Sequence, residues 1–302
     1  MKKEIGFIGL GKMGTNMVLN LLDHKYRVVV YNRSPEPTRK LAKKCAIPSY
    51  SIKEFISEIK TKPKIIWIMI TAGKPVKEII NKLIPHLNKG DIIIDGGNSF
   101  YKDSIKRGYE LKRKGIHFLD CGVSGGIEGA RKGACMMIGG DKNIFKKIED
   151  LFKDMCAKDG YGYMGSNGAG HFVKGIHNGI EYGMMGAINE GIEAVKLKSK
   201  KFNINIKEVA KVYDHGSIIE GKLTHWLYES FKEPKYLDEI SCEVPKGETE
   251  KEMKSLYKEF NMPILRQAHL MRIQTRKNTI CGQFISAIRS KLGGHAIIKK
   301  KR

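Results

Sequence analysis

Five side chains able to donate, accept or remove protons lie close together in the stretch HFVKGIHNGIEYGMMG. If this stretch is helical, Lys174, Asn178 and Glu181 fall within roughly 60° of one another on one face. His177 and Tyr182 flank the same face. A base, an amide and an acid arranged in this way can bind a polar substrate and move protons to and from it.

The element that presents these side chains is predicted to be a long helix. Apolar residues recur at helical spacing from Gly168 to about Leu197, which predicts a helix of roughly 30 residues and disfavours a flexible glycine-rich loop. A second stripe of this helix consists of Gly175, Gly179, Gly183 and Gly186. Each glycine costs about 1 kcal/mol relative to alanine inside a helix. We therefore expect another backbone to pack very close to this stripe.

Length and composition limit the class of protein. A chain of 302 residues with 41% hydrophobic residues predicts about two globular domains. No stretch approaches the ~18 uncharged apolar residues of a membrane helix, and the sequence MKKEIGFIGL begins a strand too early to be a signal peptide. We expect a cytoplasmic protein that does not bind a membrane.

The cysteines show no pairing or metal-binding pattern. They contain no CxxC pair and no zinc-finger spacing, so reduced thiols are expected and neither a metal site nor a disulfide framework is predicted. The six positions are Cys45, Cys121, Cys135, Cys156, Cys242 and Cys281.

The chain is strongly basic, with a formal net charge of +23 at pH 7. This charge makes nucleic-acid binding a rival to an anionic small-molecule substrate. However, the basic residues are spread along the chain apart from the terminal KKKR, and no basic stripe is rich in aromatic residues. Nucleic acid is therefore the less favoured partner, and scattered surface lysines explain the excess equally well.

The N-terminal residues carry a dinucleotide-binding motif. A short apolar strand at residues 4–9 is followed by GLGKMG and then by a helical apolar pattern. The glycines of the G-x-G-x-x-G motif are Gly9, Gly11 and Gly14, with Met13 inside it. They permit, in order, a tight turn, the close approach of a pyrophosphate, and the packing of helix on strand.

The end of the second predicted strand, residues 27–32, indicates which dinucleotide binds. Enzymes specific for NAD usually place an acid there to bind the ribose 2′-hydroxyl. This chain has Asn32, Arg33 and Ser34 instead. An arginine beside a hydroxyl can bind a 2′-phosphate, so NADP is predicted and NAD is less favoured. The alternative is that Arg33 is a solvated loop charge.

Strands and helices then alternate along the first half of the chain. Strands are predicted at 64–70, 91–98, 116–121 and 134–140, and helices at 75–87, 102–114 and 143–155. This alternation predicts an α/β domain over residues 1–165, with a Rossmann-type, doubly wound parallel sheet. Ligands bind beyond the carboxyl ends of such strands. Polar or small residues at these ends are Asn98, Ser124, Gly125 and Gly126; the alternative interpretation is ordinary turn chemistry.

The second half of the chain is predicted to be helical. Helices are expected at residues 203–216 and 218–231, and one irregular stretch near residues 242–249. The sequence therefore predicts an all-α C-terminal domain over residues 166–302.

Several motifs together resemble one enzyme family. GFIGLGKMGTNM, DGGNS, VSGGIEGARKG, GAGHFVKGIHNGIEYGMM and RSKLGGHA are similar to those of the decarboxylating 6-phosphogluconate dehydrogenases in the β-hydroxyacid dehydrogenase superfamily. The chain is most similar to a short form that lacks a repeated helical segment. This resemblance implies oxidative decarboxylation of 6-phosphogluconate to ribulose 5-phosphate and CO₂ with reduction of NADP, a step of the pentose phosphate pathway and of gluconate utilization.

The resemblance also implies residue roles. Lys174 would act as general base and then acid, Glu181 as the second acid, and Asn178 and His177 as substrate ligands. No metal is implied. Residues implied to surround the sugar acid are Asn98, Ser124, Gly125 and Gly126; those implied near the phosphate are Tyr182, Arg272, Arg289 and His295.

A homodimer is a further implication of the resemblance. In the family, the residues matching Arg289 and His295 reach the site of a neighbouring subunit, so an exchanged C-terminal segment is expected. The helical domain would then serve both substrate binding and dimerisation.

One stretch departs from the family pattern. The sequence PKGETEKEM stands where the family has a glycine-rich stretch, a basic residue and Trp-Thr, and Lys246 is a candidate to replace a phosphate contact. Two alternative functions remain open. One is a non-decarboxylating β-hydroxyacid dehydrogenase, such as 3-hydroxyisobutyrate dehydrogenase. The other is a basic NADP-binding protein associated with nucleic acid.

Overall fold

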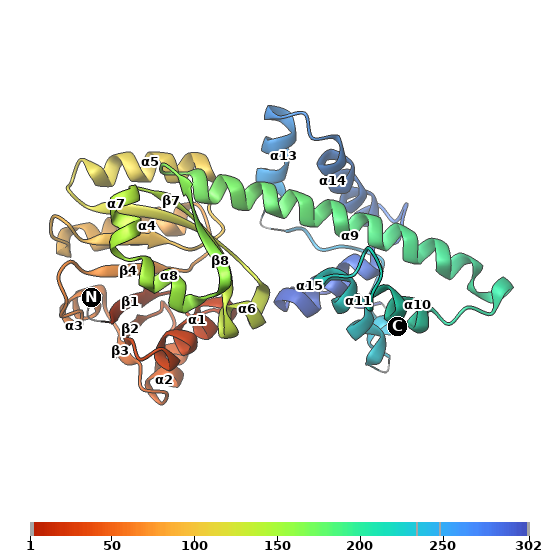
Figure 1. The fold of residues 1–302 in the computed structure, drawn as a ribbon, viewed down its shortest axis with the longest axis horizontal. Helices are drawn as coiled ribbons and strands as arrows, with labels where there is room; N and C mark the ends of the chain where they lie inside the picture. Colours follow the sequence, from red (N-terminus) through yellow and green to blue (C-terminus); the bar gives the residue numbers. More distant parts are fainter. Residues whose placement is uncertain (1–2, 234, 248, 301–302) are drawn as a thin grey trace. The chain divides into compact units, whose positions relative to one another are not determined.

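A computed structural model describes residues 3–233, 235–247 and 249–300 of the chain. The chain forms two compact units that divide between Gly175 and Ile176. The first unit contains a β-sheet covered by helices, and the second is helical (Figure 1). The predicted fold class is confirmed. The division lies inside one helix, beyond the boundary predicted at residues 165 and 166.

The sheet of the first unit has the strand order β3-β2-β1-β4-β5-β6-β7-β8. Neighbouring strands are parallel except β6 and β7, which are antiparallel. The strands are β1 (Glu4–Ile8), β2 (Arg27–Tyr31), β3 (Ile47–Ser49), β4 (Ile65–Ile68), β5 (Ile92–Asp95), β6 (His117–Ser124), β7 (Ala134–Gly140) and β8 (Cys156–Gly165).

The predicted parallel sheet has one exception, because β7 runs antiparallel to β6. The segment between β6 and β7 contains only the short helix α6 (Gly126–Lys132). A parallel pair needs a crossover of about a dozen residues or more, so this link is too short to return the chain to the starting edge. Strands β3 and β8 were not predicted, because β3 is short and contains Pro48, and β8 is polar and rich in glycine.

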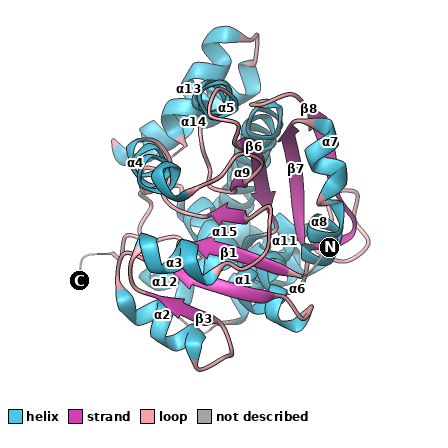
Figure 2. Ribbon diagram, turned by 90° about the vertical axis from the view of Figure 1, so that its left-hand side faces the viewer, coloured by secondary structure: helices cyan, strands magenta, loops and turns pink. Residues whose placement is uncertain are grey.

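Helices cover both faces of the sheet (Figure 2). Along β1, Ile5 and Phe7 join one apolar cluster and Ile8 joins the other, as the period of two in a strand requires. The first cluster receives side chains from α1 (Lys12–Asp23), α2 (Pro35–Ala42), α6, α7 (Lys142–Lys147) and α8 (Glu149–Met155). The second receives them from α3 (Ile52–Glu58), α4 (Lys74–Leu83) and α5 (Tyr101–Lys112).

The long helix predicted from Gly168 is present as α9 (Ala169–Phe202). Its first turn is held by Asp120, a fully buried residue of β6. One carboxylate oxygen of Asp120 accepts a hydrogen bond from Gly168 N at 2.6 Å, and the other accepts one from His171 N at 2.9 Å. Asp120 is thus a buried cap of α9 that comes from a distant strand.

The glycine stripe of α9 packs against α14 (Pro263–Arg276) within the second unit. A Cβ atom added to Gly179 would lie 3.1 Å from Leu265, and one added to Gly183 would lie 3.1 Å from Ile264. The expected close helix is therefore present at these glycines. Side chains of α14, rather than its backbone, meet the stripe, so this detail of the expectation was wrong.

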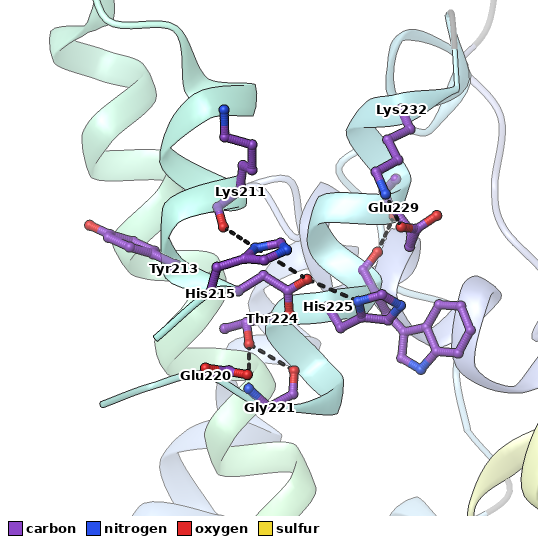
Figure 3. Close-up of polar contacts among 12 residues, drawn as sticks. Lys211, Tyr213, His215, Glu220, Gly221, Thr224, His225, Glu229 and Lys232 are labelled. Carbon is purple, nitrogen blue, oxygen red and sulfur yellow. Dashed lines mark hydrogen bonds and ion pairs between the residues drawn. The ribbon is translucent and has the colours of Figure 1, made fainter. Parts of the chain in front are cut away.

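The described residues of the second unit form six further helices. They are α10 (Ile206–Tyr213), α11 (Lys222–Lys232), α12 (Tyr236–Glu239), α13 (Glu250–Glu259), α14 and α15 (Gln283–Gly293). Polar contacts hold the turn between α10 and α11 (Figure 3). His225 Nδ1 lies 2.9 Å from Asp214 Oδ2, and Gly221 N donates to Thr224 Oγ1 at 2.9 Å. The irregular stretch 242–249 is non-helical where it is described.

The prediction of reduced thiols was wrong for one pair of cysteines. Cys242 and Cys281 form a disulfide that joins the irregular stretch to the turn before α15. Their separation of 39 residues matches no sequence motif, so only the fold brings them together. The other four cysteines are free. Among the described residues, no helix is long and apolar enough to cross a bilayer.

The cap provided by Asp120 can be tested against an exposed cap of the same type. Asp141 accepts hydrogen bonds from Asn143 N and Ile144 N at the start of α7. We expect Asp141→Ala to lower the free energy of unfolding by about 1 kcal/mol. Asp120→Ala should cost more, roughly 2–4 kcal/mol, because it leaves buried amides unpaired. Denaturant titration measures both, and equal losses would contradict the importance of burial.

Candidate active site

The glycine-rich turn between β1 and α1 is shaped for a phosphate group. Gly9 has a φ of +97°, and a Cβ there would overlap Met69 O. A Cβ on Gly14 would overlap Gly9 O, whereas one on Gly11 would meet nothing within 4 Å. No described side chain caps α1. The first-turn amides and the open space at Gly11 therefore fit a pyrophosphate.

The residues after β2 divide into one that supports this turn and two that are exposed. Asn32 Oδ1 accepts a hydrogen bond from Leu10 N, and Asn32 Nδ2 donates to Ser34 O, both at 3.0 Å. Asn32 thus fixes the strand end to the glycine-rich turn. Arg33 and Ser34 are exposed. Met13, in the first turn of α1, is half-buried against the apolar cluster.

A buried ion pair holds the turn that carries Asn98. Asp95, at the end of β5, accepts hydrogen bonds from Ser99 Oγ at 2.8 Å and from Arg107 Nη1 at 3.2 Å. Arg107 also donates to Gly73 O, which joins the loops after β4 and β5. Asn98 itself is exposed. The sequence analysis missed Arg107; the available signal was a basic residue on the helix after a strand that ends in aspartate.

Ser124, Gly125 and Gly126 lie where β6 ends and α6 begins. Gly125 has a φ of +112° and Gly126 a φ of +64°, a left-handed conformation that favours glycine. The three residues are half-buried. They therefore form a sharp turn at the carboxyl end of β6.

Lys174 lies against the same strand within the first unit. A Cβ on Gly122 would overlap Lys174 Cβ, so glycine at this position lets the lysine pack onto β6, two residues before Ser124. Lys174 is 8% exposed. Burial of this kind is common among lysines that transfer protons.

The next two turns of α9 carry the remaining predicted groups. Asn178 is also 8% exposed. His177 Nδ1 lies 4.0 Å from Glu181 Oε2, an i,i+4 pair on the helix. Since α9 is continuous from Ala169 to Phe202, Lys174, Asn178 and Glu181 share one face of it, as predicted.

A second cluster, within the second unit, consists of Arg272 and Arg289. Neither arginine has a described carboxylate partner at hydrogen-bond distance. The guanidinium of Arg272 lies over the ring of Tyr182, 3.3 Å from its centroid. Both Nη atoms of Arg272 are buried and have no hydrogen-bond partner among the described residues. A Cβ on Gly247 would lie 3.6 Å from Arg289 Nη2 and 3.9 Å from Arg272 Nη1, so the two guanidinium groups lie close together.

The charges of this arginine cluster are unbalanced. Burial and the charge of Arg289 lower the pKa of Arg272 to about 10, and burial lowers the pKa of Arg289 below its ordinary value. Both groups remain charged at neutral pH. Two desolvated cations, of which Arg272 has unpaired donors, bind a dianion such as a phosphate ester favourably.

The loop that covers the arginine cluster is held by Glu250. Its carboxylate accepts two hydrogen bonds from Arg276, at 2.8 and 3.0 Å, and one from Gly247 N at 3.2 Å. Burial would raise the pKa of Glu250, but these hydrogen bonds outweigh it and hold the pKa below its ordinary value. Tyr182 Oη lies 2.9 Å from Thr249 Oγ1. Glu250 was not predicted, because it lies in the stretch that departs from the family pattern.

The two other residues predicted near the phosphate are exposed to solvent. Lys246 is exposed. His295 is exposed in the segment after α15, with its ring against Gly293. No group of three His, Cys, Asp or Glu residues in the described parts of the chain is placed to hold a metal ion.

Comparison with known proteins identifies the family of the chain. Residues 4–165 match the model of the NAD binding domain of 6-phosphogluconate dehydrogenase. Over 300 residues the chain is 40% identical to the protein YqeC of Bacillus subtilis (strain 168), covering 98% of this chain and 100% of YqeC. The chain belongs to the 6-phosphogluconate dehydrogenase family. As a member of this family it is an oxidoreductase with an NAD(P)-binding Rossmann domain.

The chain matches only part of the length of longer members of the family. The chain is 45% identical over 219 residues to the decarboxylating 6-phosphogluconate dehydrogenase of Chlamydia muridarum, covering 70% of this chain and 45% of that enzyme. The chain thus spans about half the length of the decarboxylating relatives it matches.

Solved structures show the same fold. The 6-phosphogluconate dehydrogenase of Plasmodium falciparum, whose structure is described with NADP⁺ and with 6-phosphogluconate, aligns with a TM-score of 0.82 and 31% identity. The alignment covers 91% of this chain and 62% of that enzyme. The Mycobacterium tuberculosis 3-hydroxyisobutyrate dehydrogenase aligns over 96% of this chain and 99% of that chain, with a TM-score of 0.74 and 19% identity, which shows the fold alone.

The glycine-rich turn gives a prediction that separates binding from folding. Gly11→Ala should leave the melting temperature unchanged, because its Cβ meets nothing within 4 Å, but should weaken dinucleotide binding at least tenfold by blocking the pyrophosphate. Gly14→Ala should lower the melting temperature, because its Cβ overlaps Gly9 O. Calorimetry and fluorescence titration measure the two effects. Unchanged dinucleotide affinity in Gly11→Ala would contradict this placement of the pyrophosphate.

Proposed function

We propose that this protein oxidises and decarboxylates 6-phosphogluconate to ribulose 5-phosphate and CO₂, with NADP as hydride acceptor. The observation that carries the proposal is the pair of desolvated arginines against Tyr182, which suits a phosphate ester. The buried Lys174, on one helix face with Asn178 and Glu181, supports the chemical step. Simple hydroxyacid substrates have no phosphate and would leave Arg272 unpaired.

In the proposed reaction, Lys174 removes the proton of the substrate 3-hydroxyl. NADP held at the glycine-rich turn would supply the acceptor for the hydride that leaves carbon 3. The protonated Lys174 then donates to the ketone oxygen, which stabilises the enolate formed as CO₂ leaves. Glu181, in its protonated form, supplies the proton to carbon 1 of the resulting enediol. Asn178 and His177 bind the substrate hydroxyls and fix their orientation.

The remaining predicted residues complete this proposal. Asn98 and the turn at Ser124, Gly125 and Gly126 would bind the sugar acid. The NADP site would be formed by Gly9, Gly11, Met13, Gly14, Asn32, Arg33 and Ser34, with Asn98 contacting the cofactor as well as the substrate. We propose that residues 1–165 serve dinucleotide binding and that residues 166–302 serve substrate binding and association of two copies. Sedimentation of the purified chain measures that association.

Lys174→Ala tests the assignment of the base. We expect the turnover number with 6-phosphogluconate to fall by roughly 10³-fold, because no other group takes its proton-transfer role. Lys198→Ala is the matched control, since Lys198 is an exposed lysine of the same helix. Affinity for NADP should be unaffected in both variants. A turnover number that does not change in Lys174→Ala would remove Lys174 from the mechanism.

Arg272→Met tests the phosphate contact and the choice of substrate. The KM for 6-phosphogluconate should rise by roughly 10- to 100-fold, the value of one or two charged hydrogen bonds, whereas Arg266→Met, at an exposed position of α14, should change little. CO₂ release by the parent protein from 6-phosphogluconate is compared with its turnover of 3-hydroxyisobutyrate. A preference of the parent for 3-hydroxyisobutyrate would refute the proposed substrate.

Arg33→Ala tests the choice of cofactor. If Arg33 binds the 2′-phosphate, the dissociation constant of NADP should rise at least tenfold, while that of NAD should change little. Isothermal titration with both dinucleotides measures the difference. Equal effects on NADP and NAD would show that Arg33 is only a surface charge.

A further inference from the structure

Two buried aspartates lie side by side on neighbouring strands of the first unit. Asp95, at the end of β5, is paired in register with Asp120 of the parallel strand β6, and both residues are fully buried. Neighbouring strands lie about 4.8 Å apart, so the sheet itself sets the separation of the two carboxylates. Asp120 holds the start of α9, the helix that carries Lys174. Whatever Asp95 holds is therefore placed at a defined distance from the start of that helix.

Asp95 holds the turn on both sides of Asn98. Its Oδ1 accepts a hydrogen bond from Gly97 N at 3.2 Å, and its Oδ2 accepts one from Ser99 Oγ at 2.8 Å. A Cβ on Gly97 would lie 2.8 Å from Ile70 O, so the turn is packed closely against the loop after β4. Asn98 is exposed, but the residues before and after it are bonded to the sheet.

Arg107, on α5, supplies the positive charge that faces Asp95. Its Nη1 donates to Asp95 Oδ2 and its Nη2 donates to Gly73 O, both at 3.2 Å. The same Nη2 lies 3.7 Å from Asp103 Oδ2. Arg107 is only 7% exposed. Because a guanidinium presents several donors in a rigid plane, this one side chain holds the turn after β5 and the loop after β4 together.

The helix that carries Arg107 also contacts the start of α9. Ser104 Oγ lies 2.7 Å from His171 Nδ1, and both side chains are buried. The rings of Tyr101 and Phe172 meet edge to face, with their centroids 5.3 Å apart. Helix α5 is thus packed on the first turn of α9 and is bonded, through its arginine, to the turn after β5.

We propose that Arg107 is a positioning residue for the reaction. It acts through Asp95, which fixes Asn98 relative to Lys174. The roles of Asn98 and Lys174 rest on the proposed function, but the fixing of the turn by Arg107 does not. Without the guanidinium, the turn shifts relative to α9, and a displacement of about 1 Å can lower a reaction rate by roughly 10²-fold.

Arg107→Lys tests this role, because lysine keeps the positive charge beside Asp95 but lacks the planar set of donors. Arg27→Lys is the matched control. Arg27 also donates to a buried carboxylate, that of Glu4, and to a backbone carbonyl, Glu58 O. These contacts lie where β1 and β2 begin, whereas ligands bind beyond the carboxyl ends of the strands.

The two kinetic constants separate positioning from a loss of folded protein. In Arg107→Lys the turnover number with 6-phosphogluconate should fall roughly tenfold or more, with a smaller change in KM, because the arginine cluster of the second unit is intact. Turnover is calculated per dinucleotide-binding site, so unfolded protein does not count. An unchanged turnover number, a rise in KM alone, or an equal loss in Arg27→Lys would overturn the proposal.

Hydrogen exchange tests the fixing of the turn without any assay of activity. The amides of Gly96 and Gly97 donate to Ile68 O and Asp95 Oδ1 in the parent. In Arg107→Lys a peptide that contains them should exchange faster, whereas a peptide from β7 should keep the parent rate. Arg27→Lys should leave both peptides unchanged.

The exchange result decides the proposal even if 6-phosphogluconate proves not to be the substrate. Faster exchange confined to the turn supports the role of Arg107. Parent exchange rates at Gly96 and Gly97 in Arg107→Lys would overturn it. A parent protein that does not turn over 6-phosphogluconate would instead refute the proposed function alone.

Discussion

The position of α9 depends on one buried carboxylate. Asp120 accepts hydrogen bonds from two backbone amides at the start of α9. This end of a helix is normally solvated, but here it is hydrogen-bonded to a residue of the sheet. A Cβ on Gly139 would lie 2.6 Å from Gly170 N, and the Cβ of Lys174 occupies the space that a side chain at position 122 would need. Small residues on two strands and a charged cap thus fix the position of Lys174 against β6. Lys174 is the residue proposed to transfer the proton.

The arginine cluster differs from Asp120 in how its charge is compensated. Asp120 is satisfied in the protein alone, whereas Arg272 is desolvated and its donors are unpaired within the described residues. The cost of burying it is offset in part by its contact with the ring of Tyr182. Glu250 is fully engaged by Arg276 and Gly247. The guanidinium of Arg272 therefore keeps unpaired donors within the described residues, which the proposed phosphate contact would satisfy.

The sequence predicted the parts of this arrangement that depend on local pattern. Glycines at fixed spacing, alternating apolar strands and one long helical period identified the turn at Gly11, the sheet and α9. Contacts between distant residues carry no such pattern. Nothing near Cys242 points to Cys281, and the roles of Asp120, Arg107 and Glu250 become visible only when the fold brings their partners close. The direction of β7 was missed because periodicity does not depend on strand orientation.

The disulfide between Cys242 and Cys281 has a topological consequence. It closes a covalent ring that contains the covering loop, α13 and α14, and therefore both Gly247 and Arg272. Closing a loop of this length restricts the unfolded chain by about 4 kcal/mol in a simple entropic account. A single proteolytic cut inside the ring would leave the two fragments covalently joined, so a chain nicked there would keep Gly247 and Arg272 attached.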